Sequence, residues 1–383
     1  MFSSLAPPPA HAHFFKQFNM HVDCGQPEFT PPGVVSLSTI SSPLTGPPHC
    51  HQSPSFPAAA HFIGDTSPSI DPGRYIACIS NLYTNHWLNS TSTRHEEVPL
   101  VVNTHGWVKG FGFDLVCDML RMLRPTHFVH VMSPHAGKNL PQGIFWISKN
   151  PSCADGTPLS PPLPPPPLLF DLPAIQQQRQ QLVLPLQEDG TRVPSSAVEV
   201  RALAWTAFAA HCIATMSRHS TTPTAIGMAV EEEKSSVGNQ LASLVPYKVL
   251  PRDLHSITVL HTSVPPSELG RVLNGAIVGL CGNGNGNGNS NSNSSTSVRY
   301  CRGIGIVRAV DGGALYILTP MTLAQLERVR AIEVGKLEFP STLLLTDAYQ
   351  SPYLALHSLS ASGTGAGSIR SRNNLLRTRQ VVK

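Results

Sequence analysis

A strand–helix–strand pattern constrains the fold of this chain most strongly. It opens with an uninterrupted apolar run, Pro99 to Asn103, of the kind that is buried in parallel sheets. Apolar residues then recur at helical spacing from Phe113 to Leu123, Pro125 ends that helix, and His127 to Met132 resumes as a strand. A strand, a helix and a strand within about 35 residues predict a βαβ unit with a right-handed crossover, and therefore a parallel sheet.

Two polar residues directly follow predicted strands. A short strand is predicted from Phe18 to Val22, immediately before Asp23, and Thr104 follows the apolar run that ends at Asn103. Ligands of parallel sheets gather at the carboxyl ends of the strands. Asp23 and Thr104 are therefore the first candidates for functional residues.

Asp23 has the position and the chemistry of a phosphotransferase carboxylate. A carboxylate at a strand end can order the water molecules around Mg²⁺ or accept a proton from an attacking hydroxyl. Gln26 is close enough in sequence to orient a water or a hydroxyl. The alternative is an aspartate that merely caps a turn, which for an isolated Asp-x-Gly would be the better explanation.

The segment after Asn103 reads Thr-His-Gly-Trp-Val-Lys-Gly-Phe-Gly and leads into the predicted helix. Trp107 offers a ring face on which a nucleobase could stack, an interaction worth ~1–3 kcal/mol per base. Thr104 and backbone N–H groups can hold a phosphate or a hydroxyl, Gly106 lets the backbone approach a ligand closely, and Lys109 adds positive charge. Taken singly, Trp107 as a cap on the core and Lys109 in solvent are the simpler explanations.

Biased composition divides the chain, which contains 36 Pro and 29 Gly among its 383 residues. A proline-rich run at Ser160 to Leu169 favours polyproline II, and Gly282 to Ser297 is almost purely Gly, Asn and Ser. We therefore expect an unstructured leader over 1–18, an α/β domain over 19–240 with a disordered Pro/Gln insertion near 151–195, a mainly β domain over 245–357 with a disordered loop at 282–297, and a basic flexible tail over 358–383.

The net charge and the cysteine spacing exclude few kinds of partner or site. A formal net charge of +4 permits contact with a polyanion without demanding it. The eight cysteines form no Cys-x-x-Cys pair, so neither a zinc site nor a disulfide framework is indicated. We find no apolar, uncharged segment of the ~20 residues that span a bilayer, and we expect no membrane partner.

The candidate segments occur in the order found in a known family. The sequence from Asp23 to Gly33, followed by Pro43 to Pro48, resembles the region after the Walker B strand of the nucleolar polynucleotide 5′-hydroxyl kinases that act in pre-rRNA processing. The segment from Asn103 to Gly110 is similar to the Thr-x-Gly-Trp clasp of that family. Four segments between Ser263 and Pro320 resemble its C-terminal region, and the mRNA-processing kinase with the same clasp is a more distant relative.

The resemblance implies a fold, an activity and partners. The fold is α/β, with a P-loop-type parallel sheet flanked by helices and a mainly β C-terminal domain. The implied activity is transfer of the ATP γ-phosphate, with Mg²⁺, to an RNA 5′-hydroxyl in the nucleolus of the nucleus. A pre-rRNA endonuclease is a candidate partner.

The resemblance also implies roles for individual residues. Asp23 would be the Walker B carboxylate near Mg²⁺ and the 5′-hydroxyl, with Gln26 beside it. Thr104, Gly106 and Trp107 would clasp the RNA 5′ end, with the charge of Lys109 nearby.

An arginine is also expected from a lid helix, where it would contact the transferring phosphate. A helix is predicted from Ala197 to Met216, and it carries Arg201 near its start. Arg218 is a competing candidate, because the insertion before this helix blurs the register.

The sequence departs from the family at one important point. It contains no G-x-x-x-x-G-K-[ST] phosphate-binding loop, and its Gly-Lys pairs, Gly137-Lys138 and Gly335-Lys336, lack the spaced glycine. Two explanations stay open: a truncated chain that lacks the first strand and the P-loop, or a real short form that binds RNA or partners without catalysis. We expect truncation and no kinase activity of this chain alone, with a non-catalytic scaffold as the alternative function.

Overall fold

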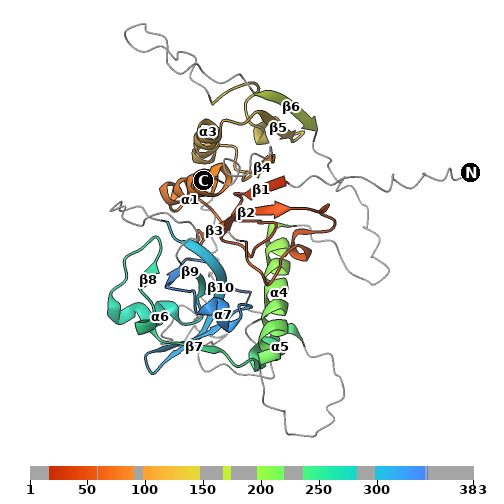
Figure 1. Ribbon diagram of the computed structural model, residues 1–383. Coiled ribbons are helices and arrows are strands. Elements are labelled where there is room, and N and C mark those ends of the chain that lie inside the picture. Colours follow the sequence, from red (N-terminus) through yellow and green to blue (C-terminus); the bar gives the residue numbers. More distant parts are fainter. Residues whose placement is uncertain are drawn as a thin grey trace, which may run out of the picture.

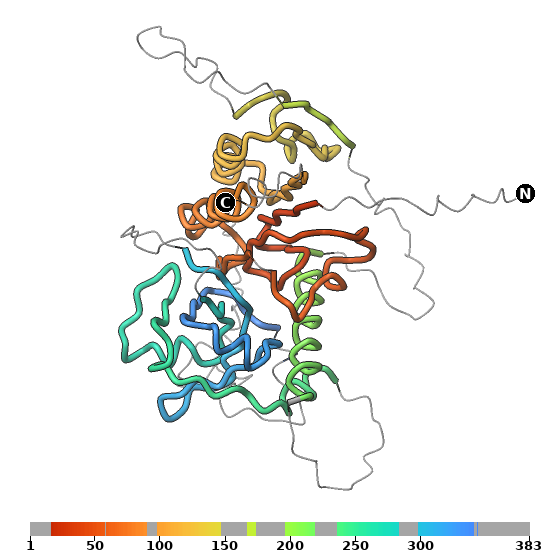
Figure 2. Tube along the Cα trace, viewed as in Figure 1, coloured from red at the N-terminus to blue at the C-terminus, as the bar shows by residue number. Residues whose placement is uncertain are grey.

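The computed structural model describes residues 17–57, 59–89, 98–146, 167–173, 196–219, 236–282, 298–340 and residue 343. The leader up to residue 16, the loop at 283–297 and the tail at 358–383 lie outside the described residues. The chain forms an N-terminal α/β region and, below it, a β-rich C-terminal region, coloured green to blue in Figure 2. The predicted α/β class with a mainly β C-terminal part is confirmed.

The N-terminal region is built on a four-stranded mixed sheet in the order β3-β2-β1-β4 (Figure 1). β1 pairs antiparallel with β2 and parallel with β4, and β2 pairs antiparallel with β3. The strands are β1 Gln17–His21, β2 Val34–Ile40, β3 Ala59–Phe62 and β4 Leu100–Asn103.

One face of this sheet packs against two helices, α1 (Pro72–Asn81) and α3 (Phe111–Leu123). α1 begins with proline at its first position, and the Asp71 side chain caps it by accepting a hydrogen bond from Arg74 N. It continues into a π-helix over Leu82–Leu88. The apolar stripe predicted for α3 is buried in the resulting core.

The strand after α3 does not join the main sheet. β5 (His127–Met132) pairs in parallel with β6 (Leu168–Pro173) in a separate two-stranded sheet. The predicted βαβ unit is therefore wrong in its pairing: β4 is an edge strand, and Val101 in it is exposed. The insertion expected to be disordered near 151–195 contains β6, because its apolar run supplies a strand partner for β5.

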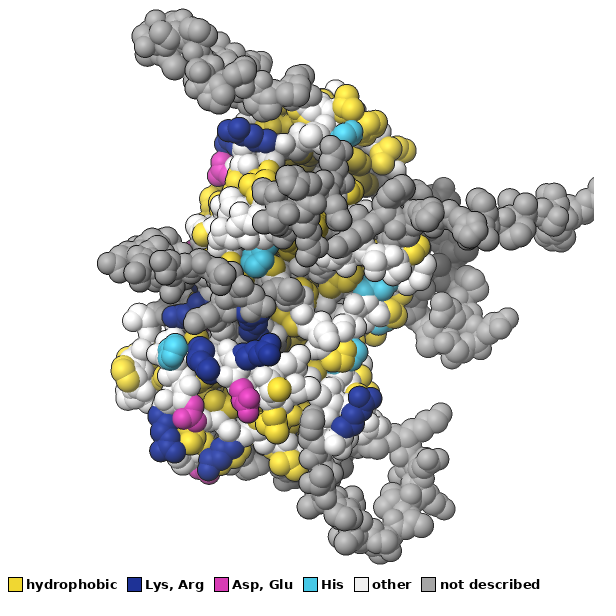
Figure 3. Space-filling model, viewed as in Figure 1, with side chains coloured by type: hydrophobic (Ala, Val, Ile, Leu, Met, Phe, Trp, Pro, Cys, Tyr) yellow, Lys and Arg dark blue, Asp and Glu magenta, His cyan; other side chains and the backbone are white. Residues whose placement is uncertain are grey.

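Both strands of this small sheet expose an apolar face. The register places alternate residues of β5 and β6 on the same side, where the upper part of the surface is largely hydrophobic in Figure 3. The exposed apolar side chains there are Val129, Val131, Leu168, Phe170 and Leu172.

The C-terminal region is a six-stranded sheet in the order β7-β11-β10-β9-β12-β8, in which only the β12–β8 pair is parallel. Its strands are β7 Tyr247–Val249, β8 Ser256–Val259, β9 Ile277–Gly282, β10 Tyr300–Asp311, β11 Ala314–Leu318 and β12 Ala331–Val334. Short helices surround it: α5 Val237–Ser243, α6 Leu269–Leu273 and α7 Leu323–Leu326.

The two regions share a hydrophobic core. Val34, Ala60 and Phe62, from the second face of the N-terminal sheet, cluster with buried residues of β9, β10 and β12. The backbones also meet: Lys336 N donates to Gly64 O at 2.6 Å, and a Cβ on Gly335 would lie 2.0 Å from that same oxygen. The C-terminal region therefore packs directly on β2 and β3, which belong to the same sheet as β1 and β4.

α4 (Ala197–Met216) closes this shared core and has the bounds predicted from the sequence. Ser196 caps it through a reciprocal pair of hydrogen bonds with Glu199. Among the described helices, α4 is the one long and apolar enough to cross a membrane by length and composition, which qualifies the expectation that no segment is. In the structure, Trp205, Phe208 and Cys212 of α4 are buried in the shared core.

Candidate functional site

The carboxyl ends of β1 and β4 lie side by side. The parallel register pairs His21 with Asn103, and Val22 N donates to Asn103 O at 3.0 Å. Asp23 and Thr104 therefore emerge next to each other at one edge of the sheet. The sequence predicts that each follows a strand, and the structure shows that the two strands are neighbours. This edge is where a parallel pair offers backbone and side-chain groups to a ligand.

The two carboxylate oxygens of Asp23 lie in different environments. Oδ1 accepts hydrogen bonds from Gly25 N at 2.9 Å and Gln26 N at 3.2 Å, so this oxygen does cap the turn after β1. Oδ2 accepts no hydrogen bond from the described residues, and the side chain is only half-buried. One carboxylate oxygen is fixed by the fold and the other is left for a ligand, with the exposed Gln26 side chain beside it.

The loop after β4 presents Trp107 on the surface. Its ring is 37% exposed and meets Phe111 edge to face, with ring centroids 6.1 Å apart. The ring lies on Gly112, where a Cβ would come 2.2 Å from it, and Trp107 is not part of the hydrophobic core clusters of the described residues. Trp107 therefore does not pack on those core clusters, and part of its side chain is open to solvent.

Two other residues of this loop are open to solvent. Thr104 is exposed, and no atom lies within 4 Å of the place where a Cβ on Gly106 would be. Gly106 is therefore not required by packing, which leaves room for a ligand against the backbone. Lys109 points toward the loop after β5, where a Cβ on Gly137 would lie 3.2 Å from Lys109 Nζ.

Two buried histidines flank Asp23, and the sequence analysis did not identify either. His21, the last residue of β1, faces the Asn103 side chain, with Nε2 and Nδ2 2.8 Å apart. His105 is 7% exposed, and its Nδ1 accepts a hydrogen bond from Trp107 N at 3.3 Å. The only available signal was the position of each histidine beside a candidate residue.

Both histidines are held neutral. Burial lowers the pKa of His21 and of His105, and the nearby Asp23 carboxylate opposes the shift in each case. His21 is also affected by Glu28, which acts in the same direction as Asp23. A neutral imidazole with one nitrogen accepting must carry its proton on the other.

Tyr75, on α1, contacts residues that follow both β1 and β4. Its side chain is fully buried, and its hydroxyl donates to Val22 O at 2.8 Å. Its ring also lies against His105, with centroids 6.1 Å apart. No motif in the sequence indicated Tyr75, because it reaches the site from a separate helix.

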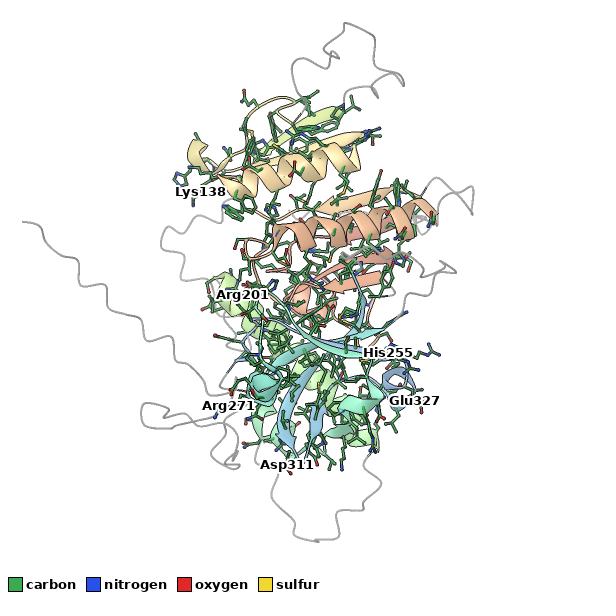
Figure 4. All side chains as sticks on the ribbon, turned by 90° about the vertical axis from the view of Figure 1, so that its left-hand side faces the viewer. Lys138, Arg201, His255, Arg271, Asp311 and Glu327 are labelled. Atoms are coloured by element: carbon green, nitrogen blue, oxygen red, sulfur yellow. The ribbon has the colours of Figure 1, made fainter. Side chains whose placement is uncertain are left out.

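The structure does not bring the lid-arginine candidate into contact with the other candidates. Arg201 lies near the start of α4, and Figure 4 shows it at the level where the two regions meet. It makes no hydrogen bond or ion pair with the described residues and is partly buried. Arg218, beyond the end of α4, is exposed.

The described residues fit part of what a phosphotransfer site requires. Mg²⁺ is usually held by one or two carboxylates together with phosphates and water, and the free oxygen of Asp23 suits that role. The described part of the chain contains no cluster of three His, Cys, Asp or Glu side chains that would bind a metal by itself. The sequence offers no phosphate-binding loop for ATP, so these residues meet the requirements for Mg²⁺ and a hydroxyl but not those for the β- and γ-phosphates.

Comparison with protein families identifies two regions. Residues 12–145 match the family described as mRNA cleavage and polyadenylation factor CLP1 P-loop, and residues 242–340 match the NOL9-like C-terminal domain. The first match contains Asp23 and the Trp107 loop, and the second covers the β-rich region.

Similar proteins of known activity were also found. The chain is 30% identical over 347 residues to polynucleotide 5′-hydroxyl-kinase NOL9 of Arabidopsis thaliana, covering 90% of this chain and 83% of that protein. It is 29% identical to the protein of the same name from Danio rerio and 27% identical to that of Homo sapiens, but spans 42% and 45% of their lengths. Two solved structures of Clp1p with Pcf11p align over 85% of the chain, with TM-scores of 0.48 and 0.46 at 14% and 13% identity.

Proposed function

This chain belongs to the polynucleotide 5′-hydroxyl-kinase family of NOL9, and from that membership we propose that it binds an RNA 5′ end where β1 and β4 end. The family activity is phosphorylation of that 5′-hydroxyl. The observation that carries the proposal is the convergence of Asp23 and the Thr104–Trp107 loop at two neighbouring parallel strand ends.

Each candidate residue has a chemical task in this proposal. Trp107 stacks on the terminal base, and Thr104 and the backbone at Gly106 hold the terminal sugar and phosphate. The free oxygen of Asp23 accepts a hydrogen bond from the 5′-hydroxyl, and Gln26 orients that hydroxyl. Lys109 attracts the RNA backbone electrostatically, so binding should weaken as salt concentration rises.

The phosphate donor is the second half of the proposed reaction. ATP with Mg²⁺ supplies the phosphoryl group when it is bound, and Asp23 would order the hydration shell of the metal. Arg201 is proposed to contact the transferring phosphate, and Arg218 is the alternative. Either arginine would have to approach the strand ends, since neither contacts Asp23 in the structure described above.

The biological setting is proposed from the family. We place the RNA substrate among pre-rRNA fragments in the nucleolus of the nucleus, with a pre-rRNA endonuclease as the partner that generates 5′-hydroxyl ends. The competing function is a non-catalytic scaffold that binds RNA or a partner in the same machinery. The absence of a phosphate-binding loop from the sequence favours that alternative for the chain by itself.

Binding and catalysis can be tested separately. The affinity of the chain for a 3′-labelled, 5′-hydroxyl RNA oligonucleotide is measured by fluorescence anisotropy, in wild type and in Trp107→Ala. Loss of the stacking ring should weaken binding about fivefold or more, from the ~1–3 kcal/mol of a stacked base. A matched control is Arg271→Ala, in an exposed ion pair on α6. Equal affinities of wild type and Trp107→Ala would contradict the proposed site.

The catalytic half is tested with labelled ATP. We expect no transfer of the γ-phosphate to a 5′-hydroxyl oligonucleotide by this chain alone, because phosphate transfer without a cradle for the β- and γ-phosphates loses its main electrostatic stabilisation. Label that appears on wild type and disappears in Asp23→Asn would overturn this expectation and establish a complete kinase.

A further inference from the structure

His105 carries a polar ring nitrogen with no partner among the described residues. Its Nε2 is buried and makes no hydrogen bond with them, and the residue as a whole is 7% exposed. Buried polar groups without partners are uncommon and destabilising, by about 1–3 kcal/mol each. Such a group in a loop that faces a ligand site points to a partner supplied by the ligand.

The tautomer of His105 follows from its other nitrogen. Nδ1 accepts a hydrogen bond from Trp107 N, so the proton of the neutral ring is on Nε2. Burial lowers the pKa of His105, which keeps the ring neutral despite the nearby Asp23 carboxylate. Nε2 is therefore an N–H donor, and its missing partner must be an acceptor such as a hydroxyl oxygen.

The ring is held in place from two sides. Tyr75 lies against it and anchors the neighbouring strand through Val22 O, and Trp107 lies on its other flank with centroids 6.5 Å apart. His105 is two residues beyond Asn103, and Asp23 is one residue beyond the Val22 that bonds to Asn103 O. His105 and Asp23 thus follow two strand ends that are hydrogen-bonded to each other, and the Asp23 carboxylate is close enough to influence the pKa of His105.

We infer that His105 recognises the 5′-hydroxyl of the RNA, with its Nε2–H donating to the hydroxyl oxygen while that hydroxyl donates to Asp23. This inference rests on the proposed function and adds a specificity-determining residue to it. A hydroxyl is both a donor and an acceptor, so it satisfies both groups at once. An RNA end without that oxygen leaves both unsatisfied, which makes the pair selective for a free 5′-hydroxyl.

The test compares RNA oligonucleotides of one sequence with a 5′-hydroxyl or a 5′-deoxy end, measured by anisotropy. Wild type should bind the 5′-hydroxyl end at least about fivefold more tightly, as expected for the two hydrogen bonds that the hydroxyl makes. This comparison changes only the ligand, so it does not depend on any variant folding. Equal affinity for the two ends would overturn the inference.

Two substitutions separate the ring nitrogens. His105→Asn keeps a polar group near the position of Nδ1 and removes the donor at Nε2, so its preference for the hydroxyl end should fall to the part that the bond to Asp23 contributes. His105→Gln places an amide near the position of Nε2 and should retain part of the preference. A preference undiminished in His105→Asn would overturn the inference.

The outcomes also distinguish this inference from the proposed function. If RNA binding depends on Trp107 but shows no preference for the 5′-hydroxyl, the role of His105 is wrong and the binding site stands. If wild type binds neither RNA, or if binding is insensitive to Trp107→Ala, the proposed site is wrong and the role of His105 fails with it.

Discussion

The Arg74 guanidinium lies 2.6 Å from the Glu333 carboxylate, measured from Nη2 to Oε2, and this ion pair joins α1 to β12. Glu333 is 2% exposed, and Arg74 also donates to Phe62 O at 3.1 Å. The next residue of α1, Tyr75, donates to Val22 beside Asp23. α1 therefore links the C-terminal region to the candidate site through two consecutive side chains.

Removing one partner of this pair should be strongly destabilising. Burial raises the pKa of Glu333, and the Arg74 and Arg299 guanidinium groups oppose that shift. Arg74→Met leaves the buried carboxylate with the more distant Arg299 as its nearby cation and a hydrogen bond from the Cys281 side chain. The expected loss is about 3 kcal/mol in the free energy of unfolding, measured in urea.

The double variant Arg74→Met with Glu333→Leu should recover much of that loss, because it removes the unpaired charge together with its partner. The matched control is Arg271→Ala, whose exposed pair with Glu268 should contribute less than about 1 kcal/mol. If Arg74→Met proves no more destabilising than this control, the buried pair is not structurally important.

His61 should make stability depend on pH. Burial lowers its pKa to about 4, against the hydrogen bonds to Arg299 O and the Asn81 side chain. The unfolded chain protonates this histidine below about pH 6.5 and the folded chain does not, so stability is full above pH 6.5 and falls as the pH falls toward 4. One such group changes the free energy of unfolding by about 1.4 kcal/mol per pH unit across that window.

The contribution of His61 to the pH dependence of stability is obtained by comparing wild type with His61→Gln. The pKa values of His21, His86 and His105 are also lowered by burial, so they act in the same direction in wild type. The free energy of unfolding, measured in urea at several pH values, should change less steeply with pH in His61→Gln than in wild type. The expected difference in slope is about 1.4 kcal/mol per pH unit, which corresponds to one proton. Identical slopes would show that His61 is not buried in its neutral form.

Gly335→Ala should separate the two regions. Its Cβ would lie 2.0 Å from Gly64 O, and a backbone atom cannot move aside as a flexible side chain can. We expect a loss of about 2 kcal/mol or more in unfolding free energy. Gly73→Ala on α1 is the control, since its Cβ would meet nothing nearer than 3.8 Å and alanine favours a helix. Equal stability of the two variants would argue against the close contact.

Gly112→Ala should displace Trp107 without deleting its ring. A Cβ there would come 2.2 Å from the Trp107 ring, so the ring must leave the surface it now occupies. Binding of a 5′-hydroxyl RNA should weaken about as much as in Trp107→Ala. Gly106→Ala complements this variant. No atom lies within 4 Å of the place where a Cβ on Gly106 would be, so the stability of the protein should be unchanged. Any loss of RNA affinity in Gly106→Ala would therefore report contact between the RNA and the backbone at this residue.

Local elements were largely predictable from the sequence. The predicted helix at Ala197–Met216 and strand at His127–Met132 have the bounds observed. The positions of Asp23 and Thr104 just after strands also followed from apolar runs alone, whereas the pairing of those strands comes from the structure. These features depend on periodicity and on helix-ending residues, which act within a few residues of the chain.

The pairing of strands was not predictable in the same way. The apolar run of β4 resembles a central strand, yet β4 is at the edge of the sheet, and β5 pairs with β6 from a segment expected to be disordered. An apolar run specifies that a strand forms, but not which strand will pair with it across a long connection. β2, β3 and α1, which lie between the first two candidates in the sequence, were not predicted at all.

The sequence by itself determined where Asp23 and the Trp107 loop stand in the chain, and which family order they follow. Only the tertiary structure decided that Tyr75 fixes both strand ends, that His105 has a buried donor without a partner, and that Arg201 is not in contact with Asp23. The physical reason is the separation along the chain over which each kind of interaction acts. Strand and helix signals are local, whereas the hydrogen bond from Tyr75 of α1 to Val22, the residue after β1, joins residues 53 positions apart, and only packing brings them together.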